Sequence, residues 1–64
     1  MCLSTVYIQA KGQRKKVMQD VAKMEFSNKG YLLIGLLGDQ KTVEGHITKI
    51  DFIGDHSVIL QTEE

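Results

Sequence analysis

Turn-forming residues recur along this chain and divide it into a series of mostly short segments. Glycine, asparagine and aspartate gather at residues 10–13, 27–30, 38–40 and 54–56. Glycine supplies the positive φ that tight turns need, and the intervening apolar residues alternate with polar ones, as in half-buried strands. A spacing of about eight to twelve residues between turns is typical of a small barrel or sandwich, so the sequence predicts an all-β protein of about six to seven short strands.

The alternating segments can be assigned to individual strands. We expect strands at residues 2–9, 31–37, 41–44, 47–52 and 57–62. Gly45 and His46 separate the strands expected at 41–44 and 47–52, and a glycine within such a strand pattern predicts a bulge or a sharp corner. We interpret residues 1–64 as a single small β-barrel domain, strongly bent and either SH3-like or Sm-like. The expected core is Val6, Ile8, Met24, Phe26, Ile34, Val43, Ile50, Phe52, Val58 and Leu60.

Residues 14–26 fit either a helix or a strand. A helical spacing of three to four residues joins Val17, Val21 and Met24. Over the last few positions, however, apolar residues alternate with charged ones and end at Phe26, as in a half-buried strand. The turn at residues 27–30 indicates a hairpin, which favours two short strands broken near residues 19–20.

The chain has 64 residues and a single cysteine, so no disulfide can form within it. A monomer of this size buries only about 60% of its unfolded surface and is marginally stable. Its apolar centre holds Leu32, Leu33, Leu36 and Leu37. This cluster exceeds what one face of a small sheet needs, and monomers rarely expose such a patch. We therefore expect a homodimer.

Cys2 is the residue with the most distinctive chemistry. A thiolate is a strong, soft ligand for late transition metals. If Met1 is retained, its amine and the Cys2 amide nitrogen can join the thiolate; if it is removed, the Cys2 amine and thiolate close a chelate ring. Nitrogen and sulfur donors in a plane suit square-planar Ni(II) or Cu(II). The alternative is that Cys2 is a small buried hydrophobic residue, as many free cysteines are.

Other candidate sites are weaker. His46 and His56 lie in separate turns without a local metal-ligand spacing, so we interpret both as exposed turn residues. The basic run at residues 13–16, with Tyr7 and Tyr31 as stacking partners, suggests a small RNA-binding module as the alternative function. The formal net charge is zero, which makes nucleic-acid binding unlikely as a general property. No nucleophile, base and orienting group form a recognisable set, so we expect no enzyme.

The sequence also bears on location. The first residues lack the charged and apolar regions of a secretory signal. No apolar run approaches the roughly 20 residues of a membrane span, and a lone reduced cysteine fits a reducing compartment. We expect a cytoplasmic protein that does not enter a membrane.

Residues 1–7, with cysteine second, resemble the start of the CooT-type small nickel-binding proteins, which are associated with maturation of carbon monoxide dehydrogenase. The similarity continues through residues 21–22, 37–39, 43–51 and 58–60, nearly the whole chain. It implies a small β protein, typically a homodimer, that binds Ni(II) through Cys2 as a metallochaperone for a client nickel enzyme. The basic residues 14–16 stand where acidic ones are common in the family. Members are also often labelled RNA-binding, which keeps that alternative open.

Overall fold

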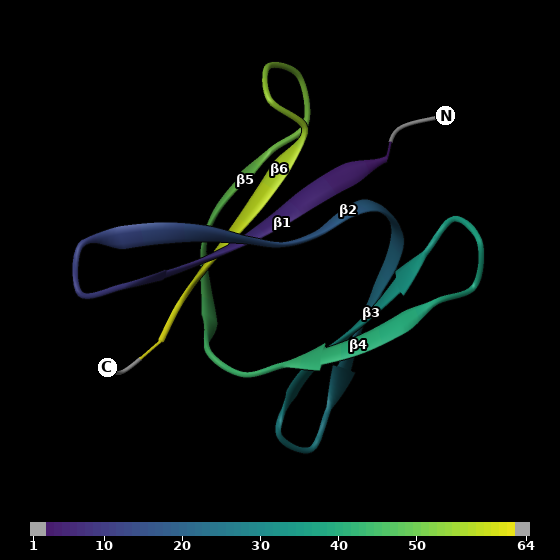
Figure 1. The fold of residues 1–64 in the computed structure, drawn as a ribbon, viewed down its shortest axis with the longest axis horizontal. Coiled ribbons are helices and arrows are strands. Elements are labelled where there is room, and N and C mark those ends of the chain that lie inside the picture. The colour runs from purple at the N-terminus through teal and green to yellow at the C-terminus, as the bar shows by residue number, and fades with distance from the viewer. Residues whose placement is uncertain (1–2, 63–64) are drawn as a thin grey trace.

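A computed structural model of the chain describes residues 3–62. Within them the chain forms six strands and no helix: β1 (Ser4–Ala10), β2 (Gln13–Ser27), β3 (Gly30–Gly35), β4 (Gln40–Val43), β5 (His46–Asp51) and β6 (Ser57–Gln61). They join in one sheet of order β4-β3-β2-β1-β6-β5 (Figure 1). Neighbouring strands are antiparallel except β1 and β6, which are parallel. The prediction of a small, bent all-β fold is confirmed. Residues 3–62 therefore contain no helix that is long and apolar enough to cross a membrane.

β2 is the longest strand, and it bends. Its first part pairs with β1, and its second part, from Val21 onward, pairs with β3. Asp20 has φ 56° at the point where the pairing partner changes. The ladder to β3 also slips between Val21 and Lys23. Irregularities of this kind bend a strand and increase its twist. The expected break near residues 19–20 is thus a bend within one strand, and the helical alternative for residues 14–26 is wrong.

Gly45 makes the second sharp corner. β4 and β5 occupy opposite edges of the sheet, yet only Glu44 and Gly45 separate them in the chain. The sheet must therefore curl until its two edges approach each other at this corner (Figure 1). No ladder joins β4 to β5 within residues 3–62, so the barrel is bent but not closed by hydrogen bonds there. Gly45 has φ 129°, and a Cβ on it would come within 2.8 Å of the Gln61 carbonyl oxygen.

The core lies inside the curl of the sheet. Its buried cluster consists of Val6, Val21, Leu33, Val43, Val58 and Leu60. Four of these residues, Val6, Val43, Val58 and Leu60, were expected from the sequence. Leu33 takes the place expected for Ile34, because the pairing of Met24 with Leu33 turns the odd-numbered residue inward. Ile8 and Met24 are partly buried against the cluster.

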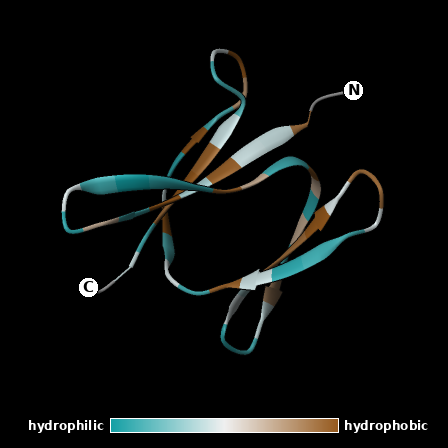
Figure 2. Ribbon diagram, viewed as in Figure 1, coloured by the Kyte–Doolittle hydropathy of each residue, from teal (hydrophilic) through white to brown (hydrophobic). Residues whose placement is uncertain are grey.

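Three expected core residues are exposed instead. Phe26 is 87% exposed, Phe52 75% and Ile50 45%. Phe26 lies one residue before the β2–β3 turn, where its ring packs against Tyr31 at 5.5 Å between centroids. Phe52 follows the last residue of β5 and so stands in a loop. Alternation no longer applies to Phe52, whereas Phe26 and Ile50 lie within their strands and are nevertheless exposed. Figure 2 shows the exposed apolar segments at the β3–β4 and β5–β6 turns.

We predict that Gly45→Ala lowers the free energy of unfolding by about 3 kcal/mol, because alanine would be strained at positive φ and would collide with Gln61. Gly38→Ala is the matched control: Gly38 has φ 92°, but a Cβ there meets nothing within 4 Å. It should cost only about 1 kcal/mol. Urea unfolding measures both. Equal losses would show that backbone strain alone matters and that the corner is not tightly packed.

Candidate functional site

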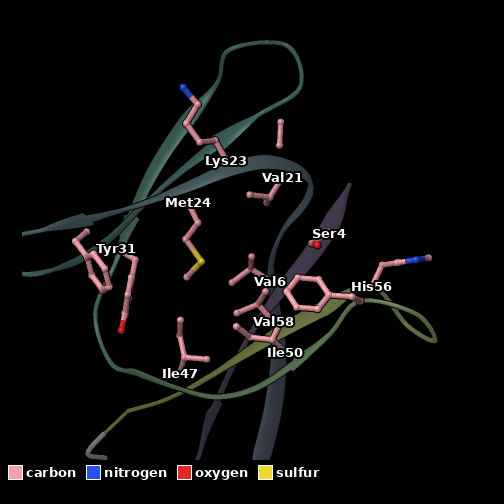
Figure 3. Close-up of a pocket in the computed structure, with 13 residues that line it drawn as sticks. Ser4, Val6, Val21, Lys23, Met24, Tyr31, Ile47, Ile50, His56 and Val58 are labelled. Atoms are coloured by element: carbon pink, nitrogen blue, oxygen red, sulfur yellow. The ribbon is translucent and has the colours of Figure 1, made fainter. Parts of the chain in front are cut away.

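The curled sheet forms an apolar cavity of about 430 Å³ that is open to solvent on one side. Val6 and Val58 line it from the paired strands β1 and β6, while Met24 and Tyr31 come from β2 and β3 (Figure 3). The exposed rings of Phe26 and Phe52 also belong to its lining. Its polar lining includes Ser4, Lys23 and His56. An apolar hollow with a few polar groups is the usual form of a binding site in a small protein.

Parallel pairing brings the start of β1 beside the start of β6. Thr5 is the partner of Ser57, and the Thr5 amide donates a hydrogen bond of 3.0 Å to the His56 carbonyl oxygen. His56 is half-buried, has φ 51° and lines the same cavity as Ser4. The expectation that His56 is a fully exposed turn residue is therefore corrected. The constraint comes from a non-local strand pair, which the sequence does not reveal.

His46 is the first residue of β5, and its strand partner is Gln61 at the far end of β6. It is exposed, as expected. The structure therefore separates the two histidines, and of the two it is His56 that lies beside the start of β1. Met1 and Cys2, the predicted metal ligands, lie outside the described residues. Within residues 3–62, no three histidine, cysteine, aspartate or glutamate side chains gather as a possible metal site.

The basic run lies on the part of β2 before its bend. Arg14, Lys15 and Lys16 are all exposed. The Arg14 guanidinium lies 5.7 Å from the centroid of the Tyr7 ring, a cation–π contact. Tyr31 packs against Phe26. Both tyrosines on which a nucleic acid could stack thus already contact another side chain.

Asp51 organises the loop between β5 and β6. Its Oδ1 accepts hydrogen bonds from the amides of Ile53, at 3.0 Å, and Gly54, at 2.8 Å. Backbone hydrogen bonds from Gly54, Ile53 and Asp55 hold the pKa of Asp51 below its ordinary value. This loop carries Phe52 along the cavity and leads into His56. The Asp51 carboxylate therefore helps to place one wall of the cavity.

The fold and cavity define a structural class: small proteins built from one bent sheet around an apolar hollow. Comparison with known families makes the assignment specific. Residues 1–61 match the family described as "CO dehydrogenase accessory protein CooT". The chain therefore belongs to the CooT family, whose members are accessory proteins and not enzymes. The resemblance seen in the sequence is confirmed.

A solved structure agrees with this assignment at the level of the fold. The crystal structure of "putative CooT" from Carboxydothermus hydrogenoformans superposes with a TM-score of 0.87 at 22% sequence identity. The match covers 98% of this chain and 100% of that one. At such low identity the likeness establishes the fold alone. A search of curated protein sequences finds no match.

The Asp51 hydrogen bonds lead to a pH prediction. Because the folded pKa is lowered, the ionised carboxylate stabilises the loop above pH 3.8 and this contribution is lost as the pH falls through the folded value. We expect the amide proton shifts of Ile53 and Gly54 to titrate together with a midpoint below 3.8. NMR spectra across this range test it, and Asp51→Asn should abolish the transition. A midpoint above 3.8 would contradict the hydrogen-bond arrangement.

Proposed function

We propose that this protein binds Ni(II) and supplies it to CO dehydrogenase while that enzyme is assembled. The observation that carries the proposal is the family match, which begins at Met1 and so includes Cys2. CO dehydrogenase is a nickel enzyme, and a thiolate is a strong ligand for late transition metals. We place this activity in the cytoplasm, where a single cysteine stays reduced.

The proposed ligands are the Cys2 thiolate and main-chain nitrogens at the chain start. With Met1 retained, its amine and the Cys2 amide nitrogen lie next to the thiolate in the chain. Ni(II) favours such nitrogen and sulfur donors in a square plane. The two ligand residues precede β1, so loss of the metal need not disturb the buried core. This separation of ligand from core suits a protein that must both take up and release its metal.

We further propose that the site is shared by two chains. Leu36 is 50% exposed and Leu37 93% exposed at the β3–β4 turn, an apolar surface that a second chain would cover. A two-fold interface brings identical residues together around its axis. If the start of β1 lies near that axis, two Cys2 thiolates and two main-chain nitrogens complete one N₂S₂ site. Either this turn or β1 itself would form the interface.

Replacing the thiol tests the ligand assignment. We expect Cys2→Ser to abolish the ultraviolet thiolate-to-nickel charge-transfer band and lower nickel affinity at least a hundredfold, while the folded-state circular dichroism stays unchanged. His46→Ala and His56→Ala are controls that should retain the band, because the proposed shell contains no imidazole. A strong thiolate band in the serine variant would contradict the assignment. Loss of the band in His56→Ala would place that side chain in the metal shell.

Stoichiometry tests the shared site. We expect one nickel per two chains at saturation and a dimer that dissociates less readily with nickel, because the metal binds the pair better than single chains. Calorimetry and analytical ultracentrifugation measure these two quantities. Nickel affinity should also weaken as pH falls, since the donors must lose protons to bind. One nickel per chain with unchanged dimerisation would instead indicate an independent chelate on each chain.

A further inference from the structure

Charge is distributed unevenly along this neutral chain. All eight acidic residues come after Gln19, whereas four of the eight basic residues, Lys11, Arg14, Lys15 and Lys16, come before it. The first 19 residues thus carry a net charge of +4, from four cations and no acid. The remaining residues carry −4, from four cations and eight acids. A charge-neutral protein with this division has a local, directional field but little overall attraction to a polyanion.

The fold concentrates the positive charge on one projecting element. All four basic residues belong to the β1–β2 hairpin, which extends to the left in Figure 1, opposite the β3–β4 turn that contains Asp39. Among residues 3–62, none of the four forms an ion pair with a carboxylate. Lys16 instead donates a 2.9 Å hydrogen bond to the side chain of Gln19.

Strand pairing then divides the hairpin into two faces. Tyr7 pairs with Lys16 and Gln9 pairs with Arg14, so these four residues share one face, which we call the basic hairpin face. Lys15 pairs with Ile8 on the opposite side. On the basic hairpin face, the Arg14 guanidinium lies over the Tyr7 ring. This contact holds the guanidinium in place before any partner arrives, which reduces the entropy lost on binding.

The chemistry of this face favours a protein partner. A guanidinium matches a carboxylate with two parallel hydrogen bonds, and arginine with tyrosine is a common combination at the centre of protein interfaces. A nucleic acid would need further phosphate contacts, whereas the remainder of the chain is acidic and would repel them. Arg14 also covers the Tyr7 ring that a base would need for stacking.

We infer that the basic hairpin face is the surface with which this protein docks onto a carboxylate-rich patch of a folded partner. The partner follows from the proposed function: it is the CO dehydrogenase that receives the nickel. Docking and metal binding then use different residues, because the basic hairpin face begins at Tyr7 and the proposed ligands are Met1 and Cys2. The hairpin orients the carrier on its client, and the chain start presents the metal.

The test is binding of the full-length protein to nickel-free CO dehydrogenase, measured by biolayer interferometry at low and at physiological salt. Arg14→Glu with Lys16→Glu should weaken the complex at least tenfold. The matched control is Lys41→Glu with Lys49→Glu, which changes two other exposed lysines by the same charge and should leave affinity within about twofold. Arg14→Lys should give an intermediate loss, since charge remains but the planar fork is removed.

Three outcomes would overturn this inference: no binding by the unmodified protein, equal loss in both charge-reversal variants, or binding of single-stranded poly(U) RNA that the hairpin variant alone abolishes. The nickel and docking proposals can fail separately. The hairpin variant should bind nickel as the unmodified protein does, and Cys2→Ser should still dock. Circular dichroism of each variant confirms that the fold is retained.

Discussion

The parallel pairing of β1 with β6 is the interaction on which the rest of the structure depends. It joins the first strand of the chain to the last and places Val6 beside Val58 and Ile8 beside Leu60. Val6 and Leu60 are completely buried. Burial of such side chains contributes roughly 1.5–3 kcal/mol each, a large share of the stability of so short a chain. Without this pair, the β5–β6 hairpin would lose its only neighbour in the sheet order.

Two sharp bends of the backbone curl the sheet around a hollow. Asp20 bends β2 so that the sheet turns from its β1 side to its β3 side, and Gly45 turns the chain from one sheet edge to the other. Between them lies the apolar cavity, whose lining includes the exposed rings of Phe26 and Phe52. These bends are therefore as important for the cavity as the side chains that line it.

Local signals predicted much of this fold from the sequence. The turn at residues 27–30 and the sharp corner at Gly45 both form where the sequence predicted them. Each depends on the conformational freedom of residues at that position, which a local sequence pattern reveals. The interior alternation correctly placed Val6, Val43 and Val58. Phe52 was misplaced because alternation says nothing about where a strand stops. The half-burial of His56 depends on a strand pair more than fifty residues apart in sequence, and no local pattern encodes that neighbour.

The candidate site, too, could be predicted from the sequence only in part. Cys2 was identified by residue type and position, and the family match includes it. The pairing of Thr5 with Ser57 shows which part of the fold lies beside the start of β1, and it distinguishes His56 from His46. The basic run could be seen in the sequence, but its presentation on a hairpin face with Arg14 fixed over Tyr7 could not. Position along the chain thus suggests the ligand we propose, whereas strand register shows what lies beside the first residues of β1.

The central proposal is that nickel is held by the residues that immediately precede β1. The most direct test is a titration of ¹⁵N-labelled protein with Ni(II), followed by amide NMR spectra, since square-planar Ni(II) is diamagnetic. The account predicts that the largest shifts occur at Leu3, Ser4 and Thr5 and at Ser57, the strand partner of Thr5. Shifts centred on Gln61, at the opposite end of β6, and on its β5 partner His46 would contradict it.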